Sequence, residues 1–156
     1  MRIILLTFLF VVSVTATAQA RLGETPDQLV ARYGQPLQEN DQKAEGDKVA
    51  ASYVGFQKGG FYINVTISDG ISVKERFSKV NHEALTLSET RTLLDANSQG
   101  HEWEAPETNG NQKKWIRDDG AVAALNQGFL TITTKELIAK ETIAKKLEAK
   151  PSLDGF

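Results

Sequence analysis

Residues 48–79 alternate between apolar and polar side chains, and this pattern constrains the fold more than any other feature of the chain. Strict alternation is typical of a β-strand with one buried face. The pairs Gly59-Gly60 and Asp69-Gly70 divide the stretch into three runs, and such pairs form tight turns between antiparallel strands. A two-residue turn at the first pair places Phe56 opposite Ile63. The pattern therefore predicts a three-stranded antiparallel meander with one apolar face.

The register across the second turn is predicted by requiring apolar residues to face apolar residues. A two-residue loop at Asp69-Gly70 would place Ile67 opposite Ser72, whereas a three-residue loop that begins at Ser68 places Ile67 opposite Ile71. We therefore predict the longer loop, with Gly70 at positive φ in a bulge. The predicted apolar face then consists of Val54, Phe56, Phe61, Ile63, Val65, Ile67, Ile71, Val73 and Phe77.

One acidic residue, Glu75, interrupts this apolar face, where it is predicted to lie opposite Ile63. Two explanations are open: a frayed or edge position in the sheet, or a buried carboxylate with a function. The opposite face is mixed and amphipathic, with Tyr53, Tyr62, Asn64, Thr66, Lys74 and Arg76.

Aromatic and basic side chains are enriched in protein interfaces, which makes part of this second face a candidate partner surface. Ordinary packing in the core or at its rim is the alternative for the aromatic residues. The candidate residues are Tyr53, Tyr62, Lys74 and Arg76, together with Trp103 beside a later loop.

Helix signals precede and follow the meander. Thr25 and Gln28 form a predicted capping box for a helix over residues 26–33, which Gly34 ends. Residues 38–48 have no large apolar side chain and are predicted to form a solvated loop. Thr86 or Ser88 caps a second helix that ends at Gly100, strands follow around Trp103 and over residues 113–117, 121–126 and 129–134, and a last helix covers residues 135–150.

This order predicts an α+β fold of tandem units, each a helix followed by an antiparallel three-stranded meander. The units cover about residues 21–80 and 81–134 of a single domain, residues 21–150, which includes the C-terminal helix; residues 151–156 are a tail. Residues 1–20 are predicted to be a signal peptide, because a basic start precedes an apolar run over residues 3–14 and a small-x-small cleavage site, Ala18-Gln19-Ala20.

Cleavage after Ala18 or Ala20 would release a periplasmic or secreted bacterial protein without a membrane anchor. The apolar run is shorter than the roughly 20 residues of a membrane helix. The chain has no cysteine, which excludes disulfides and a cysteine-linked lipid anchor. Its formal net charge of −2 excludes the basic excess that nucleic-acid binding requires.

No catalytic or cofactor motif is present, so we expect no cofactor and no catalytic residues. The dipeptides His82-Glu83 and His101-Glu102 lack a metal-binding spacing, so no metal site is predicted. The segments Asp118-Asp119-Gly120, Asn109-Gly110-Asn111 and Lys58-Gly59-Gly60 are interpreted as turns.

Residues 23–36, Gly-Glu-Thr-Pro-Asp-Gln-Leu-Val-Ala-Arg-Tyr-Gly-Gln-Pro, are followed by a polar loop, a strand with Tyr53 and two glycine turns. Over residues 23–77 this arrangement resembles the small outer-membrane assembly lipoproteins of the SmpA/OmlA type. The resemblance implies a non-enzymatic envelope component whose fold is related in outline to the β-lactamase inhibitor protein, with a helix-plus-sheet unit in tandem.

The leading hypothesis is therefore an exported, non-enzymatic module for protein binding or cell-envelope maintenance, with an envelope protein as partner. The alternative is an exported small hydrolase or ligand-binding protein that uses a carboxylate such as Glu75 with a histidine. The surroundings of Glu75 distinguish the two. The oligomeric state stays open.

Overall fold

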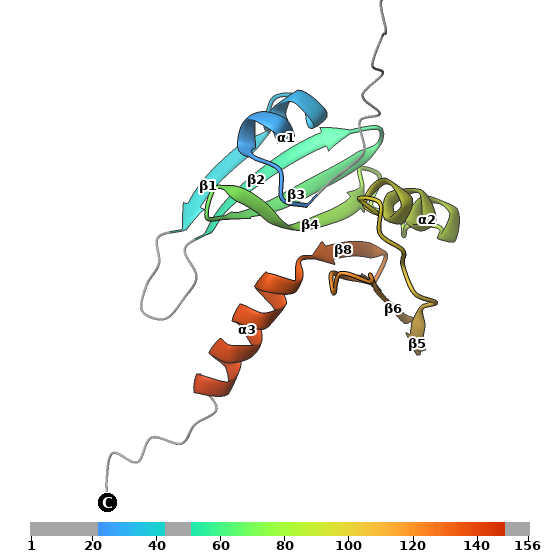
Figure 1. Cartoon of the computed structure of the whole chain (residues 1–156). Helices are drawn as coiled ribbons and strands as arrows, with labels where there is room; N and C mark the ends of the chain where they lie inside the picture. The colour runs from blue at the N-terminus through green and yellow to red at the C-terminus, as the bar shows by residue number, and fades with distance from the viewer. Residues whose placement is uncertain (1–21, 43–50, 149–156) are drawn as a thin grey trace, which may run out of the picture.

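The computed structural model describes residues 22–42 and 51–148, which form helices and strands in the order shown in Figure 1. The predicted signal peptide, residues 43–48 of the predicted loop, the last two residues of the predicted C-terminal helix and the tail lie outside the described residues. The elements are α1 (Pro26–Tyr33), β1 (Gln38–Gln42), β2 (Ala51–Lys58), β3 (Phe61–Ser68), β4 (Ile71–Lys79), α2 (Leu87–Ala96), β5 (Glu107–Asn109), β6 (Gln112–Ile116), β7 (Val122–Asn126), β8 (Phe129–Thr133) and α3 (Lys135–Glu148).

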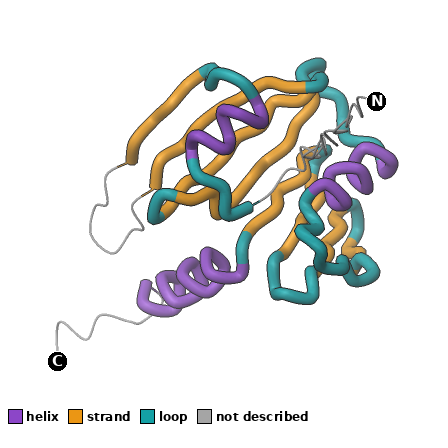
Figure 2. The backbone as a smooth tube through the Cα atoms, turned by 45° about the horizontal axis from the view of Figure 1, so that its top comes forward, coloured by secondary structure: helices purple, strands orange, loops and turns teal. Residues whose placement is uncertain are grey.

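The eight strands of the described residues, orange in Figure 2, belong to one antiparallel sheet, and their order in it is β1-β2-β3-β4-β8-β7-β6-β5. The two hairpin series are joined by a pairing of β4 with β8, in which Glu75 lies opposite Ile132. The predicted α+β class, with helices and an antiparallel sheet and a C-terminal helix, is confirmed.

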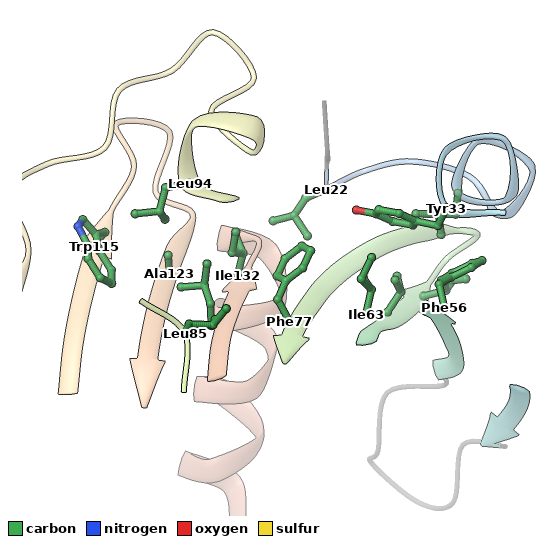
Figure 3. Packing of buried hydrophobic residues seen from close by; sticks show 14 residues of the cluster. Leu22, Tyr33, Phe56, Ile63, Phe77, Leu85, Leu94, Trp115, Ala123 and Ile132 are labelled. Atoms are coloured by element: carbon green, nitrogen blue, oxygen red, sulfur yellow. The ribbon is translucent and has the colours of Figure 1, made fainter. Parts of the chain in front are cut away.

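The helices α1 and α2 cover the same face of the sheet, which we call the inner face (Figure 3). The core lies between these helices and the strands, where Leu29 of α1 and Leu130 and Ile132 of β8 have no exposed surface. The third helix, α3, contacts the opposite face, because Lys74 of β4 is 2.7 Å from Glu141. We call that opposite side the outer face. The core cluster comprises Leu22, Leu29, Tyr33, Phe56, Ile63, Val65, Ile67, Phe77, Leu85, Leu94, Trp115, Ala123, Leu130 and Ile132.

Both predicted helix starts are confirmed with their capping boxes. The Thr25 side chain accepts a hydrogen bond from the backbone N–H of Gln28, and Thr86 does the same for Glu89. The prediction that α2 ends at Gly100 is wrong. Its C-cap is Asn97, whose backbone N–H and side-chain amide both donate to Leu93 O, so the last turn is already satisfied there.

The first hairpin has the predicted register, with Phe56 opposite Ile63, but the predicted loop at the second turn is wrong. Only Asp69 and Gly70 lie outside the strands, both at positive φ (55° and 80°), and Ile67 lies opposite Ser72. A β-bulge near the turn then shifts the register by one residue, so that Val65 lies opposite Glu75. The bulge keeps the apolar side chains of β3 and β4 on the same face of the sheet, which is the effect that the longer loop was predicted to have. Ile71, predicted to be buried, is 41% exposed.

The prediction of a loop over residues 38–48 is wrong for residues 38–42, which form β1. This strand needs no apolar side chains, because its backbone pairs with β2, as in Gln38 opposite Gly55. Polar side chains on an edge strand also discourage pairing with other chains.

In the second half, Trp115 lies opposite Ala123, and Ala123 opposite Ile132. Trp103 makes only an isolated bridge with Arg117 rather than belonging to a longer strand. The additional strand β5 was not predicted.

Candidate functional site

Four of the five residues predicted to form a partner surface share the outer face. In one row across the sheet Tyr53, Thr66 and Lys74 are neighbours, and in the next row Asn64 and Arg76 are neighbours. Tyr62 lies on the same side of β3 as Thr66. Tyr53 is 41% exposed, so its ring is available to a partner.

The basic side chains of this face differ in their partners. The Lys74 ammonium contacts Glu141 of α3, which neutralises it. The Arg76 guanidinium lies 4.3 Å from the centre of the Phe129 ring and forms no ion pair with a described residue. A cation above an aromatic ring keeps its charge accessible at its other side. Of these two basic residues, Arg76 is therefore the one whose charge is available to a partner.

Trp103, the fifth predicted residue, lies on the inner side of the sheet, so its grouping with the tyrosines is wrong. Its indole Nε1 donates to Leu94 O of α2 at 2.9 Å, and Arg117 lies 5.4 Å from its ring centre. Sequence spacing alone did not show that the segment around Trp103 folds back beneath α2.

A cleft of about 690 Å³ opens beside Trp103, between α2 and the segment that leads into β5 and β6. We call it the α2 cleft. Both tryptophans of the chain line it, and Leu87, the first residue of α2, also lines it and is 63% exposed. The sequence pattern missed this site because Leu87 and Leu94 are spaced as core residues of a helix. The lining residues are Leu87, Ser88, Thr90, Arg91, Leu94, Asp95, Trp103, Glu104, Ala105, Pro106, Lys113 and Trp115.

Glu75 occupies neither a frayed nor an edge position, contrary to the first of the two explanations. It has no exposed surface, because β3 and β8 flank β4 and α1 covers it. The Tyr33 hydroxyl donates to Glu75 Oε2 at 3.1 Å, and the Arg32 guanidinium pairs with Glu24. We call these four residues the Glu75 cluster.

The Glu75 cluster is incompletely hydrogen-bonded. Glu75 Oε1, Glu24 Oε2 and two guanidinium nitrogens of Arg32 are buried without a partner among the described residues. Burial raises the pKa of Glu75 to about 7, against the lowering effects of Tyr33 and Arg32. Burial and the neighbouring Glu75 raise the pKa of Tyr33, so its hydroxyl stays protonated.

A carboxylate with a pKa near neutrality suits acid-base chemistry, but only where a substrate can reach it. Glu75 has no exposed surface, and the groups that act on it are Tyr33 and Arg32. Within residues 22–42 and 51–148, no hydrogen bond or ion pair joins Glu75 to a histidine.

His101 belongs to a different cluster, at the C-terminal end of α2. Its Nδ1 is 2.5 Å from Asp118 Oδ1 and its Nε2 is 4.0 Å from Asp119. Asp119 accepts two hydrogen bonds from Arg117, at 2.8 and 2.7 Å, and these lower the pKa of Asp119 to about 2. His82 is exposed after β4, at a φ of 60°.

Arg117 is only 3% exposed and also donates to Asn97 O and to Gln99 Oε1. We call Asn97, Gln99, Arg117 and Asp119 the Arg117 cluster. It joins the end of α2 to the turn between β6 and β7. In the part of the chain that the structure describes, no three histidine, aspartate or glutamate side chains are grouped so as to hold a metal ion.

Comparisons with models of protein families, with curated proteins and with solved structures find no match to this chain. None of the described helices is both long and apolar enough to cross a membrane. The functional assignment therefore depends on the residues themselves.

Proposed function

We propose that this chain is an exported, non-enzymatic protein-binding module of the bacterial cell envelope, periplasmic or secreted, and that the outer face binds the partner. The observation that carries the proposal is that this face presents both the exposed Tyr53 on β2 and, on the other side of β3, Arg76 of β4, which forms no ion pair with a described residue. Tyrosine and arginine dominate the binding energy of many protein interfaces. The available positive charge of Arg76 favours a partner with an acidic surface.

The order of the elements supports the tandem arrangement that the resemblance to the SmpA/OmlA lipoproteins implies. A helix followed by four strands occurs twice, as α1 with β1–β4 and as α2 with β5–β8. The last strand of each series lies at the centre of the sheet. We therefore propose two related units, each with four strands rather than the three expected. The alternative enzymatic function gains no support, because Tyr33 and Arg32 rather than a histidine act on Glu75.

Capture of partners from envelope extracts tests the binding surface. Tagged wild-type protein is compared with Arg76→Glu and with Arg91→Glu, a matched charge reversal of an exposed arginine that lines the α2 cleft. We expect at least one specific protein whose recovery depends on the outer face alone, so that the wild type and Arg91→Glu recover it and Arg76→Glu does not. Equal recovery by all three proteins would contradict the proposed surface, and turnover of a small substrate would contradict the non-enzymatic assignment.

Fractionation of bacteria that produce the full chain tests export. We expect the protein in the periplasm or the medium, with a mass that corresponds to loss of residues 1–18 or 1–20. A full-length cytosolic product would overturn this part of the proposal.

A further inference from the structure

The two ends of the α2 cleft can be told apart, because α2 and β6 run parallel along its two sides. At one end, the Arg117 side chain donates to Asn97 O, which joins the end of β6 to the end of α2. At the other end, Leu85 before α2 donates its backbone N–H to Gly128 O, in the turn that lies at the level of the start of β6. The cleft is therefore an elongated groove along the inner face.

The charged side chains of the α2 cleft separate along this groove. Lys113 lines the cleft near the start of β6, and Arg91 lines it one helical turn after the start of α2. Asp95 lies one helical turn further along α2, and Glu104, whose N–H donates to Ile116 O, lies near the end of β6. None of these four side chains forms an ion pair with a described residue. The groove is thus basic at one end and acidic at the other.

Apolar side chains line the cleft along its length. Leu87 lies at the start of α2, Trp115 on β6, and Leu94 and Trp103 toward the end of β6. The cleft volume of about 690 Å³ is within the usual range of ligand sites, about 300–1,000 Å³. The whole site lies on the face opposite Tyr53 and Arg76, so it is separate from the proposed partner surface.

We propose that the α2 cleft is a second binding site, which takes an extended polypeptide segment with one bulky apolar side chain between an acidic and a basic residue. The acidic residue faces Arg91 and Lys113, the basic residue faces Asp95 and Glu104, and the apolar side chain contacts the tryptophans. From Lys113 to the level of Ile116 is three residues of β6, or about 10 Å at 3.3 Å per residue. An extended segment spans the same distance in three residues, so the two charges are expected about three positions apart.

Selection from a library of displayed random peptides tests this proposal with the immobilised protein. We expect the wild type to enrich peptides with the acidic, apolar and basic pattern. Leu87→Asp is the variant designed to lose this enrichment, since it removes the apolar rim. Aspartate is favourable in the first turn of a helix, so α2 is expected to stay folded, which circular dichroism checks. Tyr53→Ala on the outer face is the matched control and is expected to enrich the same peptides as the wild type.

Arg91→Glu tests the proposed orientation of the peptide, in which its acidic residue faces Arg91. We expect this variant to bind the wild-type peptides about fivefold more weakly and to enrich peptides in which the acidic residue is replaced. Binding of resynthesised peptides without tryptophan or tyrosine is measured by intrinsic fluorescence, because both tryptophans line the cleft. Absence of enrichment over Leu87→Asp, enrichment without the charge pattern, or loss of the same peptides with Tyr53→Ala would each overturn the proposal. Loss with Tyr53→Ala would place peptide binding on the outer face instead, whereas the other two outcomes leave the partner surface around Arg76 unaffected, because the capture experiment tests that surface separately.

Discussion

The two halves of the inner face each bury a charged side chain near the end of a helix, but they satisfy it differently. Arg117, beside the end of α2, donates four hydrogen bonds to Asn97, Gln99 and Asp119. Glu75, beneath the end of α1, accepts one hydrogen bond from Tyr33 and has a second oxygen without a partner. A satisfied buried charge holds elements together, whereas burial of an incompletely hydrogen-bonded carboxylate raises its pKa. Burial alone therefore does not distinguish a charged residue that stabilises the fold from one that titrates near neutral pH.

Replacement of Arg117 gives the largest expected effect. Arg117→Met keeps an apolar stem but removes all four hydrogen bonds, and loss of one partner of a buried pair typically costs about 3–5 kcal/mol. We expect about 3 kcal/mol in the free energy of unfolding, the lower end of that range, because Asp119 is 32% exposed. Urea denaturation measures the change. Arg117→Lys keeps the charge without the bidentate geometry and is expected to lose less; a change below about 1 kcal/mol for Arg117→Met would refute the role of this cluster.

Replacement of Glu75 tests the other side of the comparison through pH. The pKa of Glu75 is about 7 in the folded protein and 4.5 ordinarily, so the folded state holds this proton more tightly. The resulting stabilisation is complete below pH about 4.5 and is lost as the pH rises to about 7; it amounts to about 3 kcal/mol. Glu75→Gln has no such dependence. We therefore expect the unfolding free energy of the variant, relative to wild type, to rise by up to about 3 kcal/mol between pH 4.5 and 8.

The comparison of variant with wild type at each pH cancels the contributions of other acids. Asp119, for example, has a lowered pKa and loses its stabilising contribution only as the pH falls below its ordinary range. Parallel pH profiles for wild type and Glu75→Gln would show that Glu75 does not titrate near neutrality.

Tyr33→Phe removes the hydroxyl that donates to Glu75 and gives a smaller effect. A hydrogen bond to a charged group contributes about 1.5–3 kcal/mol. We expect a loss of about 2 kcal/mol at pH 8, where Glu75 is ionised, and a smaller loss at pH 5. A double-mutant cycle with Glu75→Gln measures the coupling. Equal losses at both pH values and in both backgrounds would mean that the hydroxyl acts independently of the carboxylate.

Gly70→Ala provides a reference that touches neither cluster and has the smallest expected effect. Gly70 has a φ of 80°, and a Cβ there would meet no atom within 4 Å, so the cost is conformational. We expect a destabilisation of about 1 kcal/mol, with the same value at pH 5 and pH 8. Chemical denaturation measures it. An unchanged midpoint would show that this turn tolerates a side chain at positive φ.

Features that depend on neighbouring residues were predictable from the sequence. The capping boxes of Thr25 and Thr86 and the turn at Gly59-Gly60 need only side chains within a few positions, and all three are present. Positive φ at Gly70 was also predictable. The register of β4 was not, because the bulge near the turn has the same effect on the alternation as one extra loop residue.

Features that depend on distant segments were not predictable from the pattern. β1 is held by backbone pairing to β2 and has no apolar signal. Burial of Glu75 requires β8 and α1 together, and neither is evident from the residues around it. Trp103 lies on the opposite face of the sheet from the tyrosines, because the segment after α2 folds back so that the Trp103 indole donates to Leu94 O. The outer-face residues were predictable as a group because they alternate along three consecutive paired strands, β2, β3 and β4.

The pairing of β4 with β8 has a consequence for the order of folding. A chain being synthesised completes β4 about fifty residues before β8 exists, so during that interval β4 is the unprotected last strand of a partial sheet. Unprotected strands invite association between nascent chains, and an inward-pointing charge is one of the ways in which proteins discourage it. Glu75 has that position on β4, and Ile132 of β8 later pairs with it. A side chain that weakens the finished core at neutral pH is thus the one that protects the unfinished sheet, and its ionised form does so best.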